Sequence, residues 1–217
     1  MSEATDNLDS ISEQIRQNLT AKDAAREKML PRCRDAIRCS SEAIRAVHRQ
    51  EFVKAEGLLE SARKLLDEAE EALAASAELR NTGFFKDAQK EFVEGNVVLT
   101  IVTGKPLPTP DVLRVDSAAY LNGLAEAASE MRRYLLDSMR QGDLSKGEEL
   151  LRAMDDIYDV LVTMDFPDAI TGGLRRTTDM LRGVLERTRS DLTLAIRQKD
   201  LGNRLDKLER NLEGHLE

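Results

Sequence analysis

Four glutamates lie in two closely spaced pairs, and these pairs are the residues of the sequence best suited to chemistry. Glu91 and Glu94 are three residues apart, and Glu126 and Glu130 are four apart, so each pair falls on one face of a helix. Four carboxylates without a nearby histidine would suit a hard cation such as Mg²⁺ or Mn²⁺. Such a cation can activate water for attack on a phosphodiester.

The two pairs differ in their expected surroundings. Glu91 and Glu94 precede the segment 97–102, which is apolar nearly all round and so is expected to be buried. Carboxylates beside such a segment need a partner, either a basic side chain or a metal. Glu126 and Glu130 lie opposite the apolar stripe of their own helix, so they face water. Spacing alone also fits ordinary solvated helix surfaces, and from spacing alone this is the favoured interpretation.

A di-iron carboxylate site is a weaker alternative. That design uses Glu-x-x-His pairs. His48 and His215 are the only histidines, and neither follows a glutamate by three residues.

A row of arginines is the second candidate for function. At 3.6 residues per turn the row falls within a narrow sector of one helix, with Arg16 near the same line; it comprises Arg34, Arg38, Arg45 and Arg49. Guanidinium groups in this arrangement can bind phosphates without sequence preference. Ion pairs with acidic neighbours such as Asp35 and Glu42 are the alternative, which sequence alone favours.

Composition limits the possible function classes. The 217 residues carry 32 basic and 40 acidic side chains, a formal charge of −8, which argues against a protein that coats polyanions unspecifically. Aromatic residues make up only 4%, so binding of single strands by base stacking is not expected. No phosphate-binding glycine motif, membrane span or secretory signal is evident, and we expect a cytoplasmic protein. Cys33 and Cys39 are interpreted as reduced, structural thiols.

The chain reads as a succession of helices without strands. Capping boxes are expected at Ser10 with Glu13 and at Ser145 with Glu148, a kink at Pro31, and a linker without helix around Pro106, Pro108 and Pro110. Asp116 or Ser117 caps one helix, and Gly104 closes another. The expected helices cover residues 10–49, 51–79, 84–103, 117–142, 145–164 and 171–202.

These elements predict an all-α fold, a single-domain bundle of six to seven helices. The length suits one domain over residues 1–217. Residues 1–9 and 203–217 are expected to be frayed termini.

Six motifs resemble those of translin and Trax proteins and occur in the same order. A-R-E-K-M-L-P-R-C-R-D begins at Ala25, and V-H-R ends at Arg49. Y-L-N-G-L-A-E-A-A-S-E-M-R-R from Tyr120 resembles the signature helix of the family and is followed by D-S-M-R-Q-G-D. Y-D-V-L at Tyr158 and D-L-T-L-A-I-R from Asp191 continue the likeness, which thus spans most of the chain.

The resemblance implies a translin-like helical subunit that assembles into a hollow shell, commonly an octamer, with RNA inside. Trax-like subunits carry two carboxylates on each of two helices and cleave RNA with Mg²⁺, whereas translin-like subunits bind nucleic acid without this acidic set. Glu91, Glu94 and Glu130 match the Trax pattern. Glu126 departs from it, because eukaryotic Trax has aspartate there. The short region between the third and fourth helices resembles the compact prokaryotic-type form, which implies a shell of one subunit type.

The sequence therefore predicts a Mg²⁺-dependent endoribonuclease acting on single-stranded or short duplex RNA inside a homo-oligomeric, octameric shell. In this hypothesis the four glutamates are catalytic metal ligands, and the arginine row holds the phosphate backbone. A non-catalytic shell that binds single-stranded RNA or DNA is the alternative. A helical scaffold that binds no nucleic acid is a third possibility.

Overall fold

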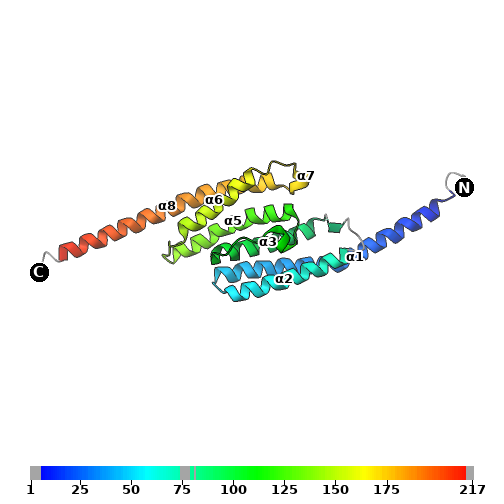
Figure 1. Cartoon of the computed structure of the whole chain (residues 1–217), viewed down its shortest axis with the longest axis horizontal. Coiled ribbons are helices and arrows are strands. Elements are labelled where there is room, and N and C mark those ends of the chain that lie inside the picture. The colour runs from blue at the N-terminus through cyan, green and yellow to red at the C-terminus, as the bar shows by residue number, and fades with distance from the viewer. Residues whose placement is uncertain (1–5, 74–78, 81, 214–217) are drawn as a thin grey trace. The chain divides into compact units, whose positions relative to one another are not determined.

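Helices make up all the regular secondary structure that the computed structural model describes, in residues 6–73, 79–80 and 82–213. There are eight within these residues, two of them only four residues long (Figure 1). The all-α prediction is therefore confirmed. The chain forms two compact units, Met1–Gly123 and Leu124–Glu217. Among the described helices, none has the length and apolar character needed to cross a membrane.

A long helical hairpin forms the base of the first unit. α1 (Leu8–His48) and α2 (Phe52–Ala72) lie side by side (Figure 1). Gln50, with φ of 60°, reverses the chain between them. An ion pair of 2.6 Å from Arg32 to Glu68 joins the two helices some five turns from the reversal.

α3 (Gly83–Thr103) packs against this hairpin. The approach is close at Gly95, where a Cβ atom would lie 2.8 Å from the Leu59 side chain and 3.5 Å from a carbonyl oxygen of α1. Gly104 ends the helix in the left-handed conformation with φ of 69°, as predicted, because glycine adopts positive φ without a steric cost.

The proline-rich connection after α3 contains a short helix that was not predicted. α4 (Pro110–Leu113) begins at a proline, whose missing N–H is not needed in a first turn. Thr109 caps it by accepting a hydrogen bond from the backbone N–H of Val112 at 3.3 Å. The expectation of a helix-free linker is therefore wrong at residues 110–113.

α5 (Ser117–Arg140) begins in the first unit and continues into the second. The Asp116 carboxylate accepts a hydrogen bond of 2.8 Å from the backbone N–H of Ala118. Asp116 is thus the cap of this helix, one of the two residues predicted for that role.

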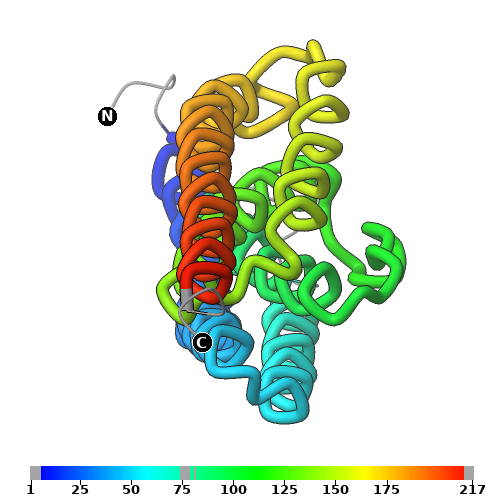
Figure 2. Tube along the Cα trace, turned by 90° about the vertical axis from the view of Figure 1, so that its left-hand side faces the viewer, coloured from blue at the N-terminus to red at the C-terminus, as the bar shows by residue number. Residues whose placement is uncertain are grey.

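The second unit contains the rest of α5, followed by α6 (Gly147–Val162), α7 (Asp168–Thr171) and α8 (Leu174–Glu213). α6 and α8 lie side by side (Figure 2). At Gly147 a Cβ atom would lie 2.7 Å from Leu192, which shows how closely the start of α6 approaches α8.

Ion pairs hold the helices of the second unit together at its surface. Arg132 of α5 bonds to Asp191 of α8 at 2.7 Å, and Asp155 of α6 bonds to Arg189 of α8 at 2.7 Å. The interior of the second unit is filled by fully buried apolar side chains, among them Met131, Leu135, Leu150, Met154, Leu181 and Leu192.

Several predicted helix ends are wrong. Ser10 lies inside α1, because the helix begins at Leu8 after Asn7. Ser145 does not cap α6, whose cap position is Lys146. The backbone N–H of Ser145 instead donates a hydrogen bond to the Asp143 carboxylate at 2.8 Å. At Ser145 this local hydrogen bond competes with the capping box, whereas at Ser10 the helix begins too early for the residue to be a cap.

Helix lengths also differ from expectation. α1 does run through Pro31, as the helix expected over residues 10–49 does, but the ends of other helices are shifted. α2 ends as an α-helix at Ala72 rather than near residue 79, and the last helix begins at Leu174, after α7, rather than at Thr171. α8 remains helical to Glu213.

Both cysteines are free thiols. Cys33 is buried in the hairpin, and this burial raises the pKa of its thiol to about 11. The buried thiol is therefore neutral at physiological pH and contributes as an apolar side chain.

Candidate metal centre and nucleic-acid interface

Glu91 and Glu94 lie on the side of α3 that does not form the core. Their neighbours Phe92 and Val93 are buried, together with Gly95. Burial of these residues leaves the two glutamates together on one face, where both are half-buried. Glu91 and Glu94 therefore share one face of α3, as predicted from their spacing.

Gly123 brings the beginning of α5 into contact with α3. A Cβ atom at this position would lie 2.6 Å from Cβ of Val93 and 2.8 Å from the carbonyl oxygen of Lys90. Any side chain larger than hydrogen would therefore push α5 away from α3. Glu126 follows Gly123 by three residues in the same uninterrupted helix, so both residues face the same way.

Three of the four predicted glutamates offer oxygen atoms to one small volume. One carboxylate oxygen each of Glu91, Glu94 and Glu126 lies within 4.8 Å of the other two, and all three side chains are half-buried. We call these residues the acidic cluster. Like charges this close repel one another unless a cation or basic group lies nearby.

Glu130, the fourth predicted ligand, is not part of the acidic cluster. It lies one turn further along α5, where its carboxylate faces Arg133 at 3.4 Å. Its side chain is 20% exposed. Glu130 is therefore placed to interact with a basic side chain of its own helix.

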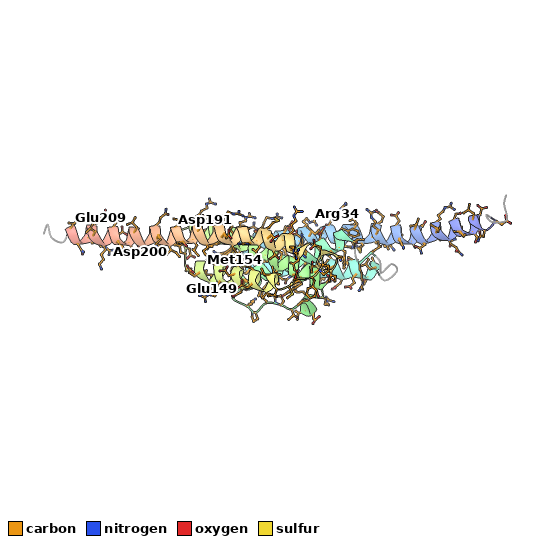
Figure 3. All side chains as sticks on the ribbon, turned by 90° about the horizontal axis from the view of Figure 1, so that it is seen from above. Arg34, Glu149, Met154, Asp191, Asp200 and Glu209 are labelled. Carbon is orange, nitrogen blue, oxygen red and sulfur yellow. The ribbon has the colours of Figure 1, made fainter. Side chains whose placement is uncertain are left out.

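Three of the four predicted arginines lie in α1 and the fourth, Arg49, is the residue that caps its C-terminal end; all four are exposed. We call Arg34, Arg38, Arg45 and Arg49 the arginine row; Figure 3 marks Arg34 on the ribbon of α1. Two members form ion pairs, Arg38 with Asp35 at 3.2 Å and Arg49 with Glu51 at 2.8 Å.

The other two members, Arg34 and Arg45, have no carboxylate within ion-pair distance among the described residues. The ion-pair alternative thus accounts for half of the row. Arg16, which was expected near the same line, pairs with Glu13 at 2.6 Å.

Arg49 and Glu51 form the ion pair at the end of the arginine row, and this pair strongly lowers the pKa of the Glu51 carboxylate. Hydrogen bonds from Arg49, and then from Lys54, lower the pKa of Glu51 to about 2. The same hydrogen bond, which Arg49 donates to the Glu51 carboxylate, raises the pKa of Arg49. Glu51 therefore stays ionised at any physiological pH and neutralises Arg49 locally.

Arg63 of α2 was not selected from the sequence, because no motif or spacing marks it. It donates a hydrogen bond of 2.7 Å to the carbonyl oxygen of Leu113, pairs with Asp67 at 2.8 Å and lies 5.5 Å from the ring centre of Phe92. Burial lowers its pKa. Arg63 therefore ties α2 to α4 and to the turn of α3 that carries Glu91 and Glu94.

Comparison with known sequences finds one informative relative. No protein-family model matches the chain. An uncharacterized protein of Methanocaldococcus jannaschii, MJ0175, is 30% identical over 197 residues, which cover 88% of this chain and 85% of that protein.

Comparison with solved structures identifies similar folds. The structure of an AfC3PO–duplex RNA complex matches with a TM-score of 0.75 and 35% identity, over 86% of this chain and 96% of that one. A crystal structure of AfC3PO matches with a TM-score of 0.75 and 34% identity, over 86% and 97%. Apo-NeC3PO matches with a TM-score of 0.74 over 88% and 97%, but at 17% identity this likeness concerns the fold alone.

Proposed function

Since the chain belongs to the translin/Trax-like family that includes AfC3PO, we propose that it is an RNA-binding subunit of a homo-oligomeric shell that cleaves RNA with Mg²⁺. The observation that carries the catalytic part is the acidic cluster. The RNA part is supported by the relative solved with duplex RNA and by the exposed arginines of α1.

The chemistry of the acidic cluster fits a small divalent cation. Mg²⁺ takes oxygen ligands at about 2.0–2.1 Å, so ligands on opposite sides of the ion are about 4.2 Å apart. Adjacent ligands of an octahedral ion are closer, at about 3 Å, so the three oxygens, which lie within 4.8 Å of one another, would move further together around a bound ion. Half-burial adds to the fit, because a bound cation would offset the repulsion of three carboxylates outside bulk water.

Glu91, Glu94 and Glu126 would hold the cation, leaving its other positions for water and phosphate oxygen. When bound, the cation supplies the acidity that turns water into a nucleophile at neutral pH and draws charge from the phosphate. A carboxylate oxygen of the acidic cluster that faces this water can accept its proton. Glu130 is a candidate for positioning the same water if Arg133 releases it.

Arg34 and Arg45 would hold the substrate. Exposed guanidinium groups without carboxylate partners are available to phosphate oxygens, and such contacts carry no sequence information. The enzyme would therefore cleave single-stranded RNA or short RNA duplexes with little sequence preference. This proposal also includes an octameric shell, which native mass measurement would test.

A non-catalytic shell that binds nucleic acid is the second candidate. The placement of Glu130 beside Arg133 favours it, because a four-carboxylate centre would need that side chain to turn away from its partner. Glu126 also favours the non-catalytic candidate, because eukaryotic Trax has the shorter aspartate at this position.

Cleavage of single-stranded RNA distinguishes the two candidates. The wild type is assayed with Mg²⁺ and with EDTA, beside Glu126→Ala and the control Glu149→Ala, which changes an exposed glutamate of α6 (Figure 3). Nuclease function predicts cleavage only with Mg²⁺, loss in Glu126→Ala and normal rates in the control. Equal rates for wild type and Glu126→Ala would reject it.

A further inference from the structure

The first turns of α1 carry a row of exposed apolar side chains. Leu8, Ile11, Ile15 and Leu19 are 57%, 42%, 54% and 59% exposed, and we call them the α1 seam. They are spaced by three or four residues, so they form a stripe along one side of the helix. Met29 and the buried stripe of α1 lie on the same side of the helix further along.

The α1 seam is exposed because α2 is too short to cover it. The hairpin is antiparallel, and Arg32 pairs with Glu68 across it. Ala72, the last residue of α2, follows Glu68 by four residues. It therefore lies level with Lys28, which precedes Arg32 by four residues in α1. The part of α1 before this point extends past α2 as a single helix (Figure 1).

The end of α8 carries a second stripe of the same kind. Leu201, Leu205, Leu208 and Leu212 are 52% to 58% exposed, and we call them the α8 seam. Their spacing of four, three and four residues is that of a coiled-coil seam. The first residue of α6, Gly147, lies beside Leu192 of α8. The part of α8 after Leu192 therefore extends beyond α6, and Figure 3 shows Asp200 and Glu209 on this stretch.

Both seams have the properties of helix surfaces that bind another helix. A single helix of this length is only marginally stable in water, and four large apolar side chains in a row gain nothing by facing solvent. Each seam covers twelve residues, with a rise of about 17 Å from the first to the last. The two therefore match in length and in the number of apolar layers.

Charge distinguishes the possible pairings. Residues 6–23, which contain the α1 seam, carry four acidic and two basic side chains, whereas residues 197–212 carry three acidic and five basic ones. Two α1 ends, or two α8 ends, would repel each other, but an α1 end attracts an α8 end. We propose that the α1 seam of one copy packs against the α8 seam of a second copy.

Such a contact joins two different surfaces, so it is head-to-tail. Repeated, it closes a ring or extends into a filament, depending on the rotation between copies. The inference rests on the homo-oligomeric state within the proposed function and is independent of RNA cleavage.

The test uses two full-length variants, each with one seam broken. Ile11→Asp with Ile15→Asp puts charge into the α1 seam, and Leu205→Asp with Leu208→Asp does so in the α8 seam. By native mass spectrometry, each variant alone should lose the wild-type assembly. Gln17→Asp with Thr20→Asp, on the opposite face of α1, should keep it. Because the substituted side chains are exposed, circular dichroism should show folded protein throughout.

Mixing the two broken variants separates head-to-tail pairing from self-pairing of either seam. The mixture retains one intact α1 seam and one intact α8 seam on different chains, so it should form a particle with one copy of each. Self-pairing predicts instead that one variant forms homodimers alone. That outcome, or wild-type assembly of either variant, would overturn the proposal, and RNA cleavage measured in parallel would show whether the nuclease proposal survives it.

Discussion

The acidic cluster and the arginine row are both sets of charged side chains, but they are built in different ways. The arginine row lies along α1 and its C-terminal cap, is exposed, and half of it is neutralised by carboxylates of neighbouring residues. The acidic cluster combines α3 with α5, is half-buried, and depends on a glycine contact. We infer that the cluster acts as a unit whose parts are all needed, whereas the row contributes separate and partly replaceable contacts.

The largest expected effect is in the acidic cluster. Glu94→Gln keeps the shape of the side chain but removes its charge, so cleavage with Mg²⁺ should fall about a hundredfold or more. Filter binding of RNA should change by less than about threefold, since the arginine row is intact. Glu149→Gln is the matched control. A cleavage rate near that of wild type would break the contrast between the two regions.

The contact that builds the acidic cluster should be sensitive to one methyl group. Gly123→Ala places a Cβ 2.6 Å from Val93, and such overpacking should lower the free energy of unfolding by about 1–3 kcal/mol. Gly57→Ala is the control, because nothing lies within 4 Å of its added Cβ and alanine favours helix there. Urea unfolding measures both. Equal stability of the two variants would contradict the close approach of α5 to α3.

The arginine row should respond gradually. Arg34→Ala with Arg45→Ala removes the two members without carboxylate partners, and RNA affinity should fall several-fold. Each lost phosphate contact should also reduce the slope of log affinity against log salt by roughly 0.7–0.9. Arg38→Ala, which removes an arginine already paired with Asp35, should have a smaller effect. An equal loss in all variants would show that the ion pairs do not matter.

The smallest effect concerns the paired end of the row. The pKa of Glu51 is about 2 because Arg49 and Lys54 donate to it, so the folded protein holds this carboxylate ionised until the pH falls to about that value. Arg49→Ala should raise the pKa of Glu51 toward its usual value of 4.5, as measured by NMR titration. Lys54→Ala should raise it less, since its hydrogen bond is the second cause. No change at neutral pH is expected, where Glu51 is ionised in either case.

Helical periodicity alone predicts the parts of the fold and site that lie on one helix. The arginine row, the Glu91–Glu94 pair and the caps at Gly104 and Asp116 could all be predicted because neighbouring residues decide them. The capping boxes at Ser10 and Ser145 are misleading, because α1 already begins at Leu8 and because the Asp143 carboxylate binds the backbone N–H of Ser145.

Contacts between helices could not be predicted in this way. Nothing in the sequence distinguishes Gly123, which approaches α3, from Gly57, which has no close neighbour. The roles of Arg63 and of the exposed seams depend likewise on where other helices end. Glu126 and Glu130 look equivalent as a pair, yet only Glu126 lies in the acidic cluster.

Binding of Mn²⁺ to the RNA-free protein, followed by electron paramagnetic resonance, tests the acidic cluster most directly. The wild type and the control Glu149→Gln should bind the ion with equal affinity. Replacement of Glu91, Glu94 and Glu126 by glutamine should weaken binding at least about tenfold while leaving the helical content unchanged. Equal Mn²⁺ affinity in the wild type and the triple variant would contradict a metal centre at this place.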